Sequence, residues 1–146
     1  MIRLEPTSRH PIVIYLLLLL AFSGARIMLG APAPGSVESV LPLWGVVAWG
    51  ACLALGAVST LVGLYLQARP NALTGAMLEQ IGMACLGTGG GIYALVMISF
   101  GGGAATIPAG LIAGLSASCV YRYWTIRGQL KAYAAISRGV TDAGEP

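Results

Sequence analysis

The sequence predicts an all-α integral membrane protein: a four-transmembrane-helix bundle with both ends in the cytoplasm and a short basic amphipathic extension at its C terminus. Three observations lead to this prediction. Of the 146 residues, 57% are hydrophobic and 9% are charged, whereas a soluble domain carries about 25% charged residues to solvate its surface. The mean hydropathy is accordingly high, at +0.82. The apolar residues form long blocks, and the basic residues gather at the ends of those blocks.

The first predicted span covers residues 11–30 and follows a cytoplasmic leader, residues 1–10. Its core from Ile12 to Leu20 is continuously apolar. A basic leader, an apolar core and small residues after Phe22 also describe a secretory signal peptide. Three further apolar blocks follow, so a retained first span is the simpler interpretation.

The second predicted span covers residues 43–67, enough to cross a hydrocarbon core that needs about 20 helical residues. It follows a loop that begins with Pro32 and Pro34, because prolines remove backbone donors and bias the preceding residues to extended conformations. Trp44 and Trp49 near its start suit interfacial anchors. Arg69-Pro70-Asn71 ends the span.

Residues 80–121 carry no charge and are too long for one crossing, since a helix rises about 1.5 Å per residue. The chain must turn back, and Gly101-Gly102-Gly103 followed by Pro108 is the place for a helix break and a new first turn. This predicts spans at 73–100 and 106–126. Residues 127–146 form a cytoplasmic tail, either a solvated extension of the last span or a basic amphipathic stretch on an anionic leaflet.

The basic residues orient the chain. Under the four-span prediction seven of the eight share one side, and the two opposite loops carry none, which places both termini in the cytoplasm. The predicted location is a bacterial cytoplasmic membrane. Three basic residues of the tail are expected to contact anionic lipid headgroups. The seven are Arg3, Arg9, Arg69, Arg122, Arg127, Lys131 and Arg138, the last three being the headgroup contacts.

Charged residues inside apolar spans are costly and are therefore candidates for function. Glu79 and Arg122 lie at similar depths in spans three and four, so we predict an intramembrane ion pair. A structural tie, a gating or proton-coupled role, and snorkelling to headgroups all remain open. Arg26 lies near the outer face, where Glu38 is its nearest acidic candidate. An outer clamp between them and simple snorkelling of Arg26 are equally open.

Small residues at four-residue spacing predict close helix packing, because lipid supplies no hydrophobic drive for helix association. The candidates are Gly87, Gly91, Gly110, Gly114 and Ser118. Contacts within the chain and a homo-oligomer interface are both open. The run Gly89-Gly90-Gly91 is a possible hinge, since each glycine weakens a helix by about 1 kcal/mol relative to alanine. The alternative is close packing against a bulky Trp or Tyr.

The sequence offers little for catalysis. His10 is the single histidine, and no two carboxylates or metal-ligand clusters share a depth. Cys52, Cys85 and Cys119 each fall inside an apolar block without a paired cysteine, as small buried residues do. We therefore expect no enzyme activity, no cofactor and no metal. The basic residues form no continuous face, so no nucleic-acid partner is expected.

Four short segments resemble small multi-span membrane proteins of actinobacterial phages and prophages, some of them holin-like. The segments are Gly24-Ala25-Arg26, Leu41-Pro42-Leu43-Trp44, Glu79-Gln80-Ile81-Gly82 and Arg122-Tyr123-Trp124. The resemblance covers about residues 10 to 130. It implies a non-enzymatic membrane protein and no catalytic residues.

Three functions remain open from the sequence. The first is a protein that oligomerises and perforates or modulates the membrane, in a holin-like manner. The second is a small proton-coupled transporter working as a dimer, in which Glu79 stands in for the first-span glutamate of small multidrug-resistance transporters. The third is an accessory subunit that docks on a larger membrane complex. The expected partners are anionic lipid headgroups and either a second copy or another membrane protein.

Overall fold

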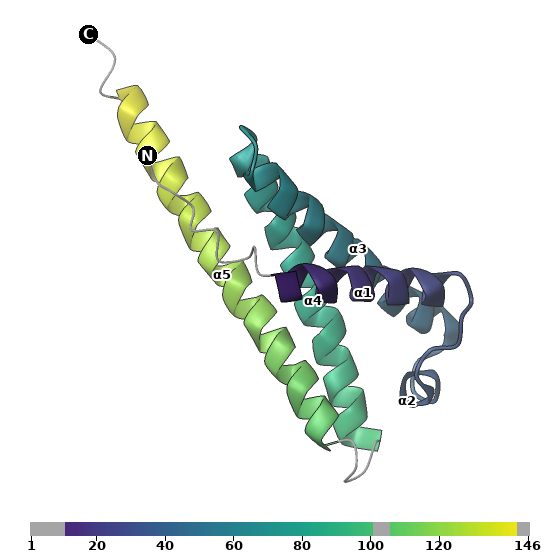
Figure 1. The fold of residues 1–146 in the computed structure, drawn as a ribbon. Helices are drawn as coiled ribbons and strands as arrows, with labels where there is room; N and C mark the ends of the chain where they lie inside the picture. Colours follow the sequence, from purple (N-terminus) through teal and green to yellow (C-terminus); the bar gives the residue numbers. More distant parts are fainter. Residues whose placement is uncertain (1–10, 101–105, 143–146) are drawn as a thin grey trace.

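A computed structural model describes residues 11–100 and 106–142, except for the side chains of Ser36 and of residues 136–142. The regular structure in these ranges is helical (Figure 1). The leader with Arg3, Arg9 and His10, and the turn at residues 101–105, lie outside the described residues. The helices are α1 (Pro11–Met28), α2 (Gly35–Glu38), α3 (Leu43–Gln67), α4 (Ala72–Phe100) and α5 (Thr106–Asp142).

Three of the described helices, α1, α3 and α4, are long and apolar enough to cross a membrane. Their buried fractions differ. Only 17% of the apolar window of α1 is buried within the protein, against 50% for α3. Much of the large apolar surface of α1 is therefore open, as in Tyr15 and Phe22. An exposed apolar surface of this extent is soluble in lipid and not in water.

Local sequence accounts for the helix ends. After α1, Gly30 adopts a positive φ of 87°, which glycine tolerates because it has no Cβ. The amide of Gly30 then donates to the carbonyl of Ile27, and that of Ala31 to Arg26, the two bonds of a Schellman motif. Helix α3 starts directly after Pro42, and Pro108 lies in the first turn of α5, where a missing N–H costs no intrahelical bond.

The long helices pack in the order α1, α3, α4, α5, and α1 and α5 share no packed interface. Figure 1 shows α5 lying along α4, while α1 runs at a steep angle to both. The arrangement is thus more open than a four-helix bundle in which every helix has two long neighbours. The cause is that the buried residues of α1 (Leu17, Gly24, Ile27) face α3, leaving a groove between α1 and α5.

Helices α3 and α4 approach each other through glycine. A methyl group placed on Gly63 would lie 2.7 Å from the carbonyl oxygen of Gly75, and one on Gly82 would lie 2.6 Å from that of Gly56. The backbones are therefore in direct contact at two levels, seven residues apart on each helix. Contact of this kind replaces the hydrophobic drive that lipid does not supply.

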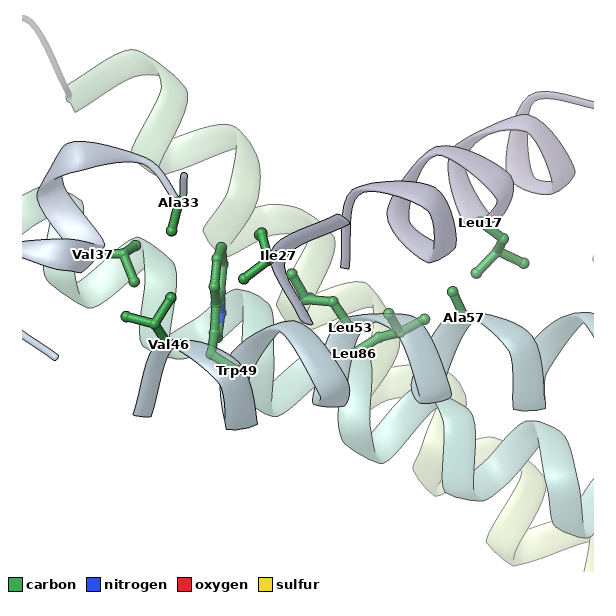
Figure 2. Close-up of a cluster of buried hydrophobic side chains, with 9 residues drawn as sticks. All are labelled: Leu17, Ile27, Ala33, Val37, Val46, Trp49, Leu53, Ala57 and Leu86. Carbon is green, nitrogen blue, oxygen red and sulfur yellow. The ribbon is translucent and has the colours of Figure 1, made fainter. Parts of the chain in front are cut away.

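The same register continues to a third level, where tryptophan replaces glycine on α3. Trp49 lies opposite Gly89, and its indole Nε1 donates to the Gly89 carbonyl oxygen at 2.9 Å. Figure 2 shows Trp49 within the apolar cluster, with Ile27 of α1 and Leu53 of α3 beside it. Ala33 and Val37, from the segment around α2, join the cluster. The loop between α1 and α3 is thereby held on the protein.

Helix α5 continues without a break from residue 106 to residue 142. The boundary predicted at residue 126, between a fourth span and a tail, is thus not a helix boundary. Ile126 is 1% exposed, whereas Arg127 and Lys131 beyond it are exposed.

Candidate functional site

The most polar buried position in the described residues is Glu79 on α4, which is 0% exposed. Arg122 of α5 donates through Nε to Glu79 Oε1 at 2.8 Å and through Nη2 to Oε2 at 3.4 Å. Gln67 of α3 donates through Nε2 to Oε2 at 2.5 Å. The structure thus brings Glu79 and Arg122 together, and it adds a third residue from a third helix. We name Gln67, Glu79 and Arg122 the carboxylate cluster.

Glycine makes this cluster geometrically possible. A methyl group on Gly63 would lie 2.6 Å from the backbone nitrogen of Glu79, and one on Gly75 would lie 2.7 Å from the backbone nitrogen of Gln67. Because α3 and α4 approach closely at this level, the side chain of Gln67 is long enough for its amide to reach a carboxylate on the neighbouring helix. Arg122 reaches the same carboxylate from α5.

The arrangement of the cluster is suited to holding helices together. Both oxygens of the carboxylate are occupied by fixed donors, and no buried side-chain nitrogen or oxygen among the described residues lacks a partner. A buried charge in lipid is tolerated when it is paired and hydrogen-bonded in this way. Arg122 is 22% exposed and lines the groove between α1 and α5. The Glu79 carboxylate is thus buried, whereas the Arg122 guanidinium that neutralises it borders the groove.

Other reactive groups in the described residues are engaged locally. Thr60 and Ser116 each donate a hydroxyl to a carbonyl of their own helix, at 2.8 and 2.9 Å. Cys52 donates to the Cys85 carbonyl at 3.2 Å, and the three cysteines are free thiols. Within the described part of the chain no group of three or more His, Cys, Asp or Glu is placed to hold a metal.

The groove between α1 and α5 has a volume of about 700 Å³. Its floor is formed by α3 and α4, through residues such as Leu53 and Leu86, and its walls by Leu17 of α1 and Ile112 of α5. Arg26 lines it as well as Arg122. The lining is otherwise largely apolar, with a few serine and tyrosine hydroxyls.

The predicted outer clamp is not formed. The structure places no ion pair between Arg26 and Glu38, and Glu38 Oε1 instead accepts the backbone N–H of Ala33 at 2.7 Å. The physical reason is local. Ala33 and Glu38 are five residues apart in the same loop, whereas Arg26 lies farther away along the chain, on α1. Within the described residues, the Arg26 guanidinium has no acidic partner.

The structure divides the predicted packing glycines. Gly87 packs on α5, where a methyl group would lie 3.3 Å from Val120. In contrast, a methyl group on Gly91, Gly110 or Gly114 would meet nothing within 4 Å. Contacts with the described residues therefore do not explain these three, and Ser118, in the same row of α5, is exposed.

The glycine run 89–91 is not unwound, since α4 is helical from Ala72 to Phe100. Gly89 gives room to Trp49 and Leu53, and a methyl group on Gly90 would collide with Ser116. The run is therefore explained at two of its positions by close packing against a bulky neighbour. Helix α4 passes through the run without a break.

Of the predicted headgroup residues, Arg127 and Lys131 are exposed on α5. The Arg127 guanidinium lies over the Trp124 ring, 5.2 Å from its centroid, a pairing of cation and aromatic ring suited to a membrane interface. The side chain of Arg138 lies outside the described side chains.

Sequence reasoning missed Gln67 and the glycines of the α3–α4 contact. A signal for the glycines was present: Gly56 and Gly63 are seven residues apart, as are Gly75, Gly82 and Gly89. A search at four-residue spacing alone does not find them. Gln67 has no comparable signal, because an amide at the end of an apolar block is also typical of a solvated helix end.

Comparison of the chain with protein-family models, curated proteins and solved structures found no match.

Proposed function

We propose that this chain is a four-span protein of the bacterial cytoplasmic membrane that self-associates through α5 and acts on the membrane itself, in a holin-like manner, without catalysing a reaction. In this proposal residues 106–126 of α5 form the fourth span. Both ends of the chain are cytoplasmic.

The observation that carries the proposal is the uncovered face of α5. Among the described elements this helix packs chiefly on α4, and Gly110 and Gly114 have open space above them in the described part of the chain. The glycines of the α1–α3 and α3–α4 contacts, by comparison, are in backbone contact with a neighbour. Ile107, Leu111 and Leu115 are 78%, 68% and 52% exposed around the open glycines. Small residues bordered by large apolar ones form the surface on which a second membrane helix packs.

The positions of the charges support one cytoplasmic side. Arg122 contacts Glu79 at the end of the second turn of α4. The part of α5 after Arg122 therefore lies at the same end of the protein as Arg69, which precedes α4. Arg127 and Lys131 thus share an end with Arg69, as the positive-inside rule expects of a cytoplasmic face.

The carboxylate cluster favours this function over proton-coupled transport. A proton carrier has to alternate between charged and neutral forms and between the two sides of the membrane. Glu79 is fully buried and holds three donor contacts from two neighbouring helices. These contacts support a structural role for Glu79.

The test is expression under tight induction in a bacterium, with membrane potential followed by a dye alongside viable counts. Oligomers are measured in the same cells by chemical cross-linking in the membrane. We expect abrupt loss of potential after a delay, and cross-linked species above the monomer. The double variant Gly110→Ala, Gly114→Ala should lengthen the delay and weaken the cross-linked species, because its methyl groups fill the proposed contact.

The matched control is Gly91→Ala, which also adds a methyl group in open space but on α4. It should keep both the timing and the oligomers. If the protein accumulates normally in the cells and the membrane potential and viable counts stay stable, the proposed action on the membrane is refuted. Unchanged oligomers in the double variant would remove α5 as the interface.

A further inference from the structure

Arg26 is in an unusual position for a membrane protein of this orientation. It lies in the last turn of α1, near the end opposite the proposed cytoplasmic face, where the positive-inside rule expects few basic residues. The acidic residue closest to it in the chain, Glu38, is engaged with the Ala33 amide. Among the residues that the structure describes, no carboxylate neutralises Arg26.

The groove beside Arg26 is long and apolar. It extends from Arg26 and Tyr93 to Ser116 and Arg122, from the outer end of α1 towards the carboxylate cluster. Its volume of about 700 Å³ lies within the roughly 300–1,000 Å³ of small-ligand sites. No acidic residue of the described part of the chain lines it, and the charge of Arg122 is already neutralised by Glu79. The unneutralised charge on the groove is therefore the single positive charge of Arg26.

We propose that this groove binds an anionic phospholipid of the outer leaflet, with its phosphate on the Arg26 guanidinium and an acyl chain along the apolar lining. Charge complementarity carries the assignment. The groove presents one unpaired cation at the depth of the headgroups and an apolar wall at the depth of the acyl chains. A guanidinium is well suited to hold a phosphate through paired N–H donors.

A second copy of the chain fits the groove less well. The glycines of the proposed self-association face, Gly110 and Gly114, do not line the groove, although Leu115 beside them does. A helix seated in the groove would also have to supply a carboxylate opposite Arg26. Among the side chains that the structure describes, the carboxylates are those of Glu79, which is buried, and Glu38, which is engaged.

Trp49 provides a reporter, because it lines the groove and is 8% exposed. The other two tryptophans, Trp44 and Trp124, are 76% and 59% exposed and do not line it. The background protein is therefore Trp44→Phe, Trp124→Phe, reconstituted in phosphatidylcholine vesicles with increasing brominated phosphatidylglycerol or brominated phosphatidylcholine. Bromine quenches indole fluorescence at short range, so the quenching reports which lipid occupies the groove.

We expect brominated phosphatidylglycerol to compete for the site about fivefold better than brominated phosphatidylcholine. This is the ratio that corresponds to about 1 kcal/mol for one basic residue at a membrane surface. Arg26→Gln should reduce the ratio to about one, and Arg26→Lys should retain most of it. The control Arg69→Gln, which removes an exposed arginine outside the groove lining, should leave the ratio unchanged.

Two outcomes overturn the proposal. Equal quenching by the two brominated lipids would mean that lipid fills the groove without selecting the headgroup. No quenching by either lipid would mean that protein covers the groove. Cooperative unfolding of each variant in SDS is measured in parallel, so that loss of the ratio is assigned to Arg26 only in a folded protein. Neither result depends on the loss of membrane potential that tests the proposed function.

Discussion

The carboxylate cluster predicts an asymmetry between its two charged members. We consider Arg122→Met, which keeps an unbranched side chain without charge, and Glu79→Gln, which keeps the shape of the carboxylate. Arg122→Met leaves a carboxylate that is 0% exposed with Gln67 as its remaining partner. Glu79→Gln leaves a guanidinium that is 22% exposed beside an open groove. The two variants thus strand charges in very different surroundings.

The magnitudes follow from burial. Removing one partner of a buried pair costs about 3–5 kcal/mol, because an uncompensated charge stays inside. We expect Arg122→Met to lie in this range. Glu79→Gln should cost about 1–3 kcal/mol, since it weakens charge-assisted hydrogen bonds but leaves Arg122 able to reach polar surroundings. The double variant should be more stable than Arg122→Met alone, because it contains no stranded charge.

The assay is reversible unfolding by SDS in mixed micelles, followed by tryptophan fluorescence, on the wild type, both single variants and the double variant. The four free energies of unfolding form a double-mutant cycle. The reasoning would be refuted if Glu79→Gln destabilised the protein as much as Arg122→Met. Additive single effects would also refute it, since they would mean that the 2.8 Å contact carries no coupling energy.

Two further predictions concern the α3–α4 contact and the topology. Gly63→Ala should destabilise the protein by about 1–3 kcal/mol in the same assay, because its methyl group meets backbone atoms of α4 at 2.6–3.0 Å; Gly91→Ala, in open space, should change stability by less than about 0.5 kcal/mol. In a background without native cysteines, Gly35→Cys should react with a membrane-impermeant maleimide in intact cells, and Asn71→Cys only after permeabilisation. Reaction of both in intact cells would contradict the proposed orientation.

Two members of the carboxylate cluster could be predicted from the sequence, and the third could not. Glu79 and Arg122 are the charged residues within spans three and four, and their matching depths are enough to predict that they meet. Gln67 was not predicted, because its contact depends on how closely α3 approaches α4. That distance is set by Gly63 and Gly75 acting together across two helices, and neither residue by itself indicates which neighbour it faces.

The outer clamp shows the opposite case. Arg26 and Glu38 are close in sequence and opposite in charge, yet Glu38 binds the Ala33 amide. A backbone donor five residues away competes well with a cation on another element, because the loop closes at little entropic cost. The Gly110 and Gly114 row is a similar case. Its spacing indicates close packing, but which helix occupies the face depends on the direction in which α5 rests on α4.

What the sequence determined by itself is the apolar, membrane-like character of the chain, the position of α1, α3 and α4 to within a few residues, and the pairing of Glu79 with Arg122. These follow from local composition and from the cost of placing charge in lipid. Only the tertiary structure decided which glycines are in contact, that α1 packs on α3 and leaves a groove beside α5, and that Arg26 has no acidic partner among the described residues. The physical reason is that helix packing in lipid depends on close fit between particular faces, and a face is chosen by the whole set of neighbours.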